Sequence, residues 1–343
     1  MDQSFQDSLL KWFDENKRDL PWRQDRSPYK VWLSEVILQQ TRVNQGLPYY
    51  HRFIKNFPDI KSLAQADQQD VLKLWQGLGY YNRGRNLHHA AQQVMEDFGG
   101  YFPEKYQELK KLKGVGDYTA SAIASFVYNE PLAVLDGNVK RVLSRLYNEK
   151  TPINSTEGER VFKELAEQTL DKNRPGKFNE AMMEFGALQC TPKPRCTICP
   201  LQGFCKAYQK GGQLELPVKL KKRERSYRYF NYFKVVKNGR VLLQKRTAKD
   251  IWQGLYQPPL IETQKEIKEG ARLLDGSLSK PADIRYICTY RHTLTHRQLI
   301  ARFFELYDLP EDIFNENCFW VNLNELTKYP VPKLIEKFFT THF

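Results

Sequence analysis

Four of the six cysteines lie within 16 residues and follow the pattern C-x5-C-x2-C-x5-C, as Cys190, Cys196, Cys199 and Cys205. Crowded thiols in a cytosolic chain favour a metal site over disulfides. Structural zinc sites usually pair two Cys-x2-Cys knuckles, whereas this stretch has one knuckle between two longer arms and a proline directly after Cys199, as iron–sulfur sequences have. The spacing therefore favours a four-iron cluster, with zinc or no metal as the alternatives.

A pair of glycines stands between two expected helices in the stretch LKGVGDYTA (112–120). Gly114 and Gly116 are typical of a tight turn into a helix N-terminus, where backbone N–H groups approach an anion closely. Two glycines with this spacing are more often only a turn. Between short helices of a basic chain, however, they resemble a helix-hairpin-helix, which holds a DNA phosphate without reading sequence. The context favours phosphate binding over a plain turn.

Two carboxylates occur in contrasting settings. Glu35 lies among Trp32, Val36 and other apolar residues, so it is a candidate for a carboxyl kept protonated in a poorly solvated pocket, although a solvated helical Glu is the ordinary alternative. Asp136 lies at the mouth of a helix in VLDGNVKRVLSR (134–145), where a simple N-cap is the ordinary interpretation. Together the two could supply the acid and the charge stabiliser that break a glycosidic bond.

Composition narrows the class of protein. The chain has 343 residues, enough for about two domains and a substantial core. Its 53 basic and 40 acidic residues give a net charge of +13, which suggests a polyanionic partner, most commonly nucleic acid. Charge alone is equally compatible with a merely basic surface. An aromatic content of 13% argues against disorder. No apolar run of about 18 residues and no signal-peptide pattern at the start are found, so we expect a soluble cytosolic protein.

The first 208 residues are predicted to be almost entirely helical. Apolar residues recur at helical spacing, and Gly or Pro separates the segments. The expected helices begin at Ser4 and at Ser27-Pro28 and continue over 44–57, 67–75, 83–97, 104–111, 117–128, 138–147, 155–170 and 176–188.

A basic stretch with two glycines, GGQLELPVKLKKRERSYR (211–228), is typical of an exposed linker. Strand patterns follow, with an Asn238-Gly239 hairpin turn. The expected strands are 229–236, 241–243, 284–290, 299–307 and 318–321, and the expected helices 264–274 and 332–340. The predicted fold class is therefore multidomain, with an all-helical domain (1–208), a linker (209–226) and an α+β domain (227–343).

Several stretches, in order along the helical region, resemble the endonuclease III superfamily and most closely its adenine DNA glycosylase (MutY) family. They are LPWR (20–23), SEVILQQTRV (34–43), WQGLGYYNRGRNLH (75–88), LKGVGDYTA, VLDGNVKRVLSR, FNEAMMEFGALQC (178–190) and the cysteine cluster. The C-terminal half is similar to the family's Nudix-like lesion-recognition domain through IWQGLYQPP (251–259) and HTLTH (292–296). The resemblance implies a helix-hairpin-helix glycosylase domain with a [4Fe–4S] loop, followed by a Nudix-like domain.

The resemblance also implies the reaction. A monomer would bind double-stranded DNA, with no membrane involved, and flip out an adenine that lies opposite 8-oxoguanine or guanine. Glu35 would protonate adenine N7, Asp136 would stabilise the oxocarbenium ion, and water would complete hydrolysis with retained configuration. Tyr118 and Asn138 would position these groups, and Gln40 and Tyr80 would wedge into the base stack. The adenine pocket would be lined by Arg23, Thr41 and Glu180. Thr295 and His296 would contact the lesion.

The chain departs from the wider superfamily in ways that matter. Members that also cut the strand carry a lysine nucleophile where this chain has Tyr118, and a phenol cannot form a Schiff base, so we expect a monofunctional glycosylase. The first cysteine loop has five residues where the family has six. Leu294-Thr295-His296 replaces Phe-Ser-His, which loses an aromatic ring but keeps a hydroxyl.

Two features of the second domain argue against separate chemistry there. The histidines of HTLTH could bind zinc from one helix face, but alternation with branched residues favours a loop or strand. EGARLLDG (269–276) lacks the paired glutamates of a Nudix hydrolase. The functional alternatives to an adenine glycosylase are a bifunctional glycosylase/lyase for oxidised bases and a non-catalytic DNA-binding iron–sulfur protein.

Overall fold

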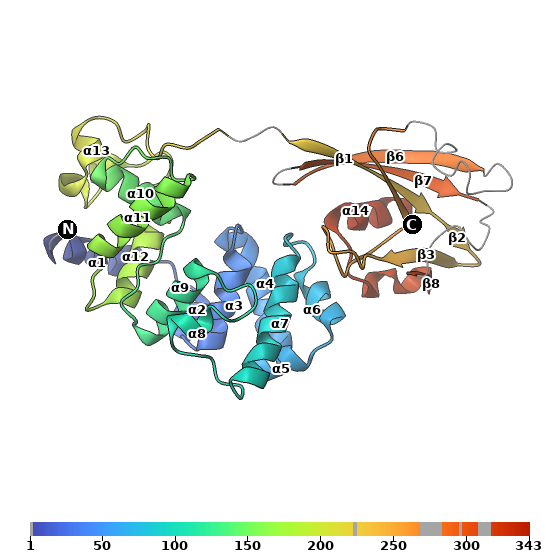
Figure 1. Cartoon of the computed structure of the whole chain (residues 1–343), viewed down its shortest axis with the longest axis horizontal. Coiled ribbons are helices and arrows are strands. Elements are labelled where there is room, and N and C mark those ends of the chain that lie inside the picture. Colours follow the sequence, from blue (N-terminus) through green and yellow to red (C-terminus); the bar gives the residue numbers. More distant parts are fainter. Residues whose placement is uncertain (1–2, 222–224, 268–282, 295–296, 308–316) are drawn as a thin grey trace. The chain divides into compact units, whose positions relative to one another are not determined.

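The computed structural model describes residues 3–221, 225–267, 283–294, 297–307 and 317–343. These form two compact units, whose helices and strands are drawn in Figure 1. Each unit has its own hydrophobic core. One unit comprises residues 1–65 and 89–221, and the other comprises residues 66–88 and 222–343. No helix in the described part of the chain combines the length and the apolar character needed to cross a membrane.

The first unit is built from helices. They are α1 (Gln3–Asn16), α2 (Pro21–Gln24), α3 (Pro28–Leu38), α4 (Val43–Asn56), α5 (Ile60–Gln65), the second half of α7 (Asn82–Asp97), α8 (Tyr106–Leu109), α9 (Asp117–Tyr128), α10 (Gly137–Tyr147), α11 (Thr156–Thr169), α12 (Pro175–Leu188) and α13 (Lys206–Gln209). Two 3-10 turns, Cys196–Ile198 and Gln202–Phe204, lie between the cysteines. The predicted helices are confirmed, although 104–111 is helical only over α8. The short helices α2, α5 and α13 were not predicted.

Helix α12 organises this unit, because it packs against α1, α9 and α10. Its apolar residues Phe178, Ala181 and Phe185 recur every three or four positions and are buried. The Phe185 ring meets Trp12 of α1 edge to face, with ring centres 4.9 Å apart. The same helix carries Glu180 and Glu184 toward the N-terminal segment, so the core helix also supplies charged groups to the site.

The second unit contains two sheets. In the first, the strand order is β5 (Leu260–Thr263), β1 (Ser226–Lys234), β7 (Arg297–Leu306) and β6 (Ile284–Thr293), and only the β1–β7 pair is parallel. In the second, β3 (Arg240–Lys245) pairs with β2 (Val236–Lys237), β4 (Tyr256–Gln257) and β8 (Cys318–Asn322). Helix α14 (Lys333–His342) packs Phe338 onto Phe303 of β7, with ring centres 3.9 Å apart.

The sequence predicted most of this unit. The Asn238-Gly239 turn has the left-handed backbone expected for a tight hairpin, with φ of 50° and 71°. The short strands β4 and β5 were not predicted. The predicted helix 264–274 is not helical at 264–267, and its remaining residues lie outside the described part of the chain.

Residues 66–88 join the second unit, although the sequence predicted them to belong with the glycosylase helices. They form α6 (Gln68–Trp75) and the start of α7. Gln76 donates from Nε2 to Glu336 Oε1 at 2.7 Å, and the Tyr81 hydroxyl donates to the Val331 carbonyl at 3.1 Å. These bonds to the segment around α14 explain why α6 and Tyr80 group with the C-terminal residues.

Candidate active site and cysteine cavity

Glu35 lies on α3 among buried apolar side chains and is itself only 6% exposed. The Tyr118 hydroxyl donates to Glu35 Oε2 at 2.8 Å. Burial raises the pKa of Glu35 to about 7; the Tyr118 hydrogen bond opposes this rise, and the charges of Asp136 and Glu180 add to it. A carboxyl with this pKa is partly protonated at neutral pH and can act as an acid.

Tyr118 follows the glycine turn, on the first turn of α9. Burial raises the pKa of its phenol well above the usual 10, so it remains a hydrogen-bond donor at neutral pH. Its oxygen also lies 4.0 Å from Met183 Sδ of α12. The phenol is thus held between α3 and α12, where it fixes the Glu35 carboxyl.

Asp136 is the N-cap of α10, and its two carboxylate oxygens have different partners. Oδ1 accepts from the Val139 backbone N–H at 2.7 Å, and Oδ2 accepts from Asn138 Nδ2 at 2.8 Å. Burial raises the pKa of Asp136, while these hydrogen bonds oppose the rise. The capping and the charge-stabilising interpretations are therefore compatible, because the cap itself orients the carboxylate.

Arg141, which the sequence analysis missed, fixes the orientation of Asn138. Its Nη2 donates to Asn138 Oδ1 at 2.9 Å and to the Gly186 carbonyl at 2.6 Å, and its Nε donates to the Cys190 carbonyl at 2.8 Å. A hydrogen-bonded path therefore joins Asp136 to the start of the cysteine loop. The signal in the sequence was the spacing of Asn138 and Arg141, three residues apart on one helix face.

Replacing Gly186 by Ala tests this arrangement, because a Cβ there would lie 2.7 Å from Asn138 Cβ. We expect Asn138 to be displaced, Asp136 to lose a donor, and the single-turnover rate of base release to fall on the order of 10²-fold, as misplacements of about 1 Å cause. Gly212→Ala is the matched control, since its nearest neighbour would be Asn148 Oδ1 at 3.9 Å. An unchanged rate in Gly186→Ala would show that Asn138 is not a positioning residue.

Arg23 and Glu180, which the sequence assigned to the base pocket, belong to a buried ion-pair network. Arg23 Nε lies 3.4 Å from Glu180 Oε1, and its Nη2 lies 3.0 Å from Glu184 Oε2. Arg18 makes three hydrogen bonds to Glu184, one from its backbone N–H and two from its guanidinium, and Arg26 pairs with Glu180 at 2.6 Å. Burial by itself raises the pKa of Glu184, but the hydrogen bonds from Arg18 and Arg23 outweigh it and lower this pKa to about 2, so Glu184 remains ionised. Arg18, Arg26 and Glu184 were not predicted, because nothing local in the sequence shows that these segments meet.

The glycine turn has the geometry of an anion site. Gly114 has φ of +79°, and Gly116 is the N-cap of α9 with no side-chain cap on the helix. A Cβ at Gly116 would meet nothing within 4 Å, so the protein's own packing does not require this glycine. Close approach of a partner's backbone to this turn would require a glycine here, because a side chain would block it. Lys110 lies beside the turn, paired with Asp117 at 2.6 Å.

The predicted wedge residues share an unusual backbone. Gln40 and Tyr80 are exposed and left-handed, with φ of 56° and 47°. Beside Gln40, Gln39 donates to Thr119 Oγ1 at 3.1 Å, which ties this turn to α9. Thr41 closes the turn by donating its N–H to the Leu38 carbonyl at 3.0 Å. Gln40 and Tyr80 lie in different units, and Thr295 and His296 lie outside the described residues.

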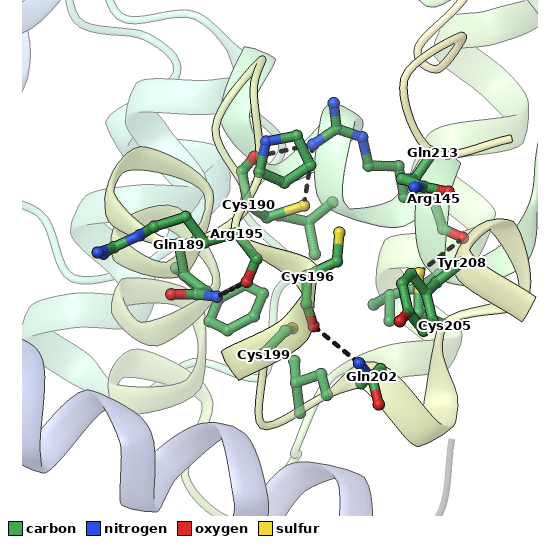
Figure 2. Close-up of a pocket in the computed structure, with 15 residues that line it drawn as sticks. Arg145, Gln189, Cys190, Arg195, Cys196, Cys199, Gln202, Cys205, Tyr208 and Gln213 are labelled. Atoms are coloured by element: carbon green, nitrogen blue, oxygen red, sulfur yellow. Dashed lines mark hydrogen bonds between the residues drawn. The ribbon is translucent and has the colours of Figure 1, made fainter. Parts of the chain in front are cut away.

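The four clustered cysteines line one cavity of about 30 Å³ (Figure 2). Arg145 donates from Nη1 to Cys190 Sγ at 3.3 Å. Burial, and then the neighbouring thiols, raise the pKa of Cys199 to about 11 and also raise those of Cys196 and Cys205. Holding these sulfurs together as thiolates therefore requires added positive charge, such as a metal centre supplies.

Four cysteine sulfurs that line one cavity are a donor set that fits a metal centre. Four sulfurs on one zinc lie about 4 Å from each other, given Zn–S bonds of about 2.3 Å. Among the described residues, no group of three or more His, Cys, Asp or Glu is placed to hold one ion. A four-iron cluster binds each cysteine to a different iron and so accepts wider spacing.

The short first loop of the cysteine stretch is closed by its own hydrogen bonds. Thr191 Oγ1 donates to the Lys193 carbonyl at 2.7 Å. Gln189 Nε2 donates to the Arg195 carbonyl at 2.8 Å (Figure 2). Lys193 and Arg195 remain exposed, so the five-residue loop still presents cations to solvent.

Comparisons with known proteins agree with this geometry. The HhH-GPD superfamily of base excision DNA repair proteins matches residues 33–168, and the NUDIX domain family matches residues 231–341. A solved thermostable thymine-DNA glycosylase is 28% identical, with a TM-score of 0.54 over 60% of this chain and 95% of that chain. The matched families and the helical fold thus define a base excision DNA glycosylase, joined to a Nudix-like domain.

The relatives identify the family within that class. The adenine DNA glycosylase of Buchnera aphidicola subsp. Baizongia pistaciae is 34% identical over 98% of both chains. The mouse adenine DNA glycosylase is 46% identical over 60% of this chain, which spans 42% of the mouse protein. The chain belongs to the adenine DNA glycosylase family and is an enzyme that acts on N-glycosidic bonds in DNA.

Proposed function

We propose that the enzyme excises adenine lying opposite 8-oxoguanine or guanine in double-stranded DNA, and that the second unit recognises the opposite base. The main observation in support of this reaction is the buried Glu35 carboxyl. It accepts a hydrogen bond from the Tyr118 hydroxyl, and it is close enough to Asp136 for the charge of Asp136 to raise the pKa of Glu35. The sequence HTLTH, whose first two residues, His292 and Thr293, end β6, supports the role of the second unit. The enzyme acts as a cytoplasmic monomer.

The reaction follows from two carboxyls with different partners. Adenine leaves the base stack and enters the site, where Glu35 gives its proton to N7. The C1′–N9 bond breaks, and its electron pair goes to the protonated base. Asp136, held ionised by the α10 N-terminus and Asn138, stabilises the positive charge that develops on the sugar. Water then adds to C1′ with retained configuration and gives its proton to the Glu35 carboxylate, which restores the acid.

The remaining residues prepare the substrate for this step. Gly114 and Gly116 hold a DNA phosphate at the N-terminus of α9. Gln40 and Tyr80, exposed and conformationally strained, enter the space that the flipped base leaves. Arg23 and Glu180 form the polar wall of the adenine pocket with Thr41, and Thr295 and His296 contact the opposite base.

Cys190, Cys196, Cys199 and Cys205 hold one [4Fe–4S] cluster in this proposal. Such a cluster would supply the positive charge that keeps the four thiolates together. Lys193 and Arg195 on its first loop then contact the DNA backbone without reading sequence. Iron and sulfide analysis of the purified protein should give four of each per chain; stoichiometric zinc without sulfide would contradict the assignment.

One gel assay tests the proposed function. A duplex with one adenine opposite 8-oxoguanine should be cleaved only after alkali, because Tyr118 provides no amine for strand cleavage. A duplex with adenine opposite thymine should remain intact. Cleavage without alkali would indicate a lyase, and no cleavage under either condition would indicate a DNA-binding protein without activity.

The pH dependence of base release should follow the protonation of Glu35. The acid must carry its proton, and burial raises its pKa to about 7, so the single-turnover rate should fall as the pH rises above 7, approaching tenfold per pH unit. On the acid side the rate should fall as Asp136 takes up a proton. A rate independent of pH between 6 and about 9 would exclude Glu35 as the acid.

A further inference from the structure

Trp252 has a strained backbone that the proposed function does not explain. Six non-glycine residues of the described chain have a positive φ; three are Asn, which tolerates this conformation, and the others are Gln40, Tyr80 and Trp252. Trp252 has φ of 61° and is 8% exposed. A bulky residue in this conformation is strained and persists only where its surroundings fix it, which is common at functional sites.

The turn that contains Trp252, residues 250–255, is fixed from within the second unit. Arg246 donates from Nε to the Ile251 carbonyl at 3.0 Å, and its own carbonyl accepts from the Gly254 N–H at 2.7 Å. Asp250 pairs with Arg246 at 3.1 Å and with Arg228 at 2.6 Å. These hydrogen bonds and ion pairs therefore fix the position of the Trp252 ring within the second unit.

One side of the 250–255 turn contacts the helices that flank Tyr80. Arg85 Nη1 of α7 donates to the Gln253 carbonyl at 2.5 Å. A Cβ at Gly254, where φ is +82°, would lie 3.3 Å from Leu72 Cδ1 of α6. Just beyond the turn, the Tyr256 hydroxyl donates to Gln69 of α6 at 2.8 Å. Because α6 and α7 bracket residues 76–81, the turn has a fixed relation to the segment that carries Tyr80.

The other side of the turn contacts the end of β6. The Trp252 ring lies against His292, with ring centres 5.8 Å apart, and against Phe230 of β1 at 6.2 Å. His292 is the penultimate residue of β6, and the Leu294 N–H donates to the Arg297 carbonyl at 2.8 Å, which joins β6 to β7. Trp252 thus stands between the Tyr80 segment and the end of β6.

We propose that Trp252 is a positioning residue for recognition of the base opposite adenine: it holds His292 and the end of β6 in register with the Tyr80 segment, with Arg85 as the second anchor. This inference rests on the proposed role of the second unit. The base-releasing groups lie in the first unit, so loss of Trp252 should change substrate preference rather than the chemistry.

The test is the ratio of single-turnover excision rates for adenine opposite 8-oxoguanine and adenine opposite guanine. In Trp252→Ala, we expect the ratio to fall about tenfold while the rate opposite guanine stays within about twofold of wild type. Trp252→Phe keeps an aromatic ring against His292 and should restore most of the ratio. Trp320→Ala, on β8 and 39% exposed, is the matched control and should leave both rates unchanged.

Two further variants distinguish a failure of the inference about Trp252 from a failure of the proposed function. Arg85→Gln removes the bond to Gln253 and should lower the ratio in the same direction, which keeps the test valid if Trp252→Ala does not fold. His296→Ala tests the proposed role of the second unit itself. If His296→Ala lowers the ratio but neither Trp252→Ala nor Arg85→Gln does, the inference is wrong and the proposed function stands. If none of the three lowers it, both are wrong. Equal losses on both substrates would mean that Trp252 is only structural.

Discussion

Replacing Glu35 by Gln should lower the single-turnover rate of adenine release by about 10²- to 10⁴-fold while leaving duplex affinity close to wild type. The amide has nearly the same shape, and its oxygen can still accept the Tyr118 hydrogen bond, but it has no proton to give to the base. The rate is measured with excess enzyme on a duplex containing adenine opposite 8-oxoguanine, and affinity by titration of the same duplex.

The same variant should be more stable than wild type at alkaline pH. Burial raises the pKa of Glu35 from 4.5 to about 7, so the folded state retains a proton that the unfolded state has lost. Wild-type stability therefore declines as pH rises through this range, by up to about 3 kcal/mol. The gain in the free energy of unfolding on Glu35→Gln should grow from pH 5 to pH 8. Activity near wild type, or a gain that does not vary with pH, would contradict the role assigned to Glu35.

Asp136→Asn should also be severely impaired, by about 10²- to 10³-fold in the rate of base release, because a neutral amide cannot stabilise the charge on the sugar. Asn caps helices about as well as Asp, so the free energy of unfolding should change by less than about 1 kcal/mol. Asp136→Ala removes the cap as well and should cost about 1 kcal/mol more. Comparing the two variants separates the catalytic role of this side chain from its structural one.

A second readout links the two carboxyls. The charge of Asp136 contributes to the raised pKa of Glu35, so the alkaline limb of the pH profile should move to lower pH in Asp136→Asn. The residual activity of that variant, followed from pH 5 to about 9, provides the measurement. An unshifted limb would mean that the two groups do not interact in the working enzyme.

Local sequence patterns were sufficient to predict most helices and strands and the types of reactive group. Apolar residues at helical spacing predicted the helices of the first unit, and Asn238-Gly239 predicted the hairpin, because these structures depend on residues near in sequence. The cysteine spacing and the glycine pair each specify a geometry over a few residues. Short segments without such signals, such as α5 and β4, were not predicted, because they are stabilised by packing against residues far away in the sequence.

The ion-pair and hydrogen-bond networks around the site could not be predicted in this way. Arg18 and Glu184 are 166 residues apart, and Arg141 reaches Cys190 across 49 residues. Their partners follow from how α1, α10 and α12 pack, and many arrangements of these helices are compatible with the same local sequence. The raised pKa of Glu35 has the same origin, because desolvation is a property of the packed site.

The sequence by itself determined the types and spacing of the reactive groups: two carboxyls, a phenol where relatives carry lysine, four cysteines and a glycine turn at a helix N-terminus. Only the tertiary structure decided that the N-cap of α10 also orients the Asp136 carboxylate, and that Arg141 and Asn138 connect Asp136 to the cysteine loop. It also decided that residues 66–88 pack with the C-terminal unit. Backbone and side-chain preferences act over a few residues, whereas desolvation, ion pairing and the grouping of helices depend on which distant surfaces the fold brings together.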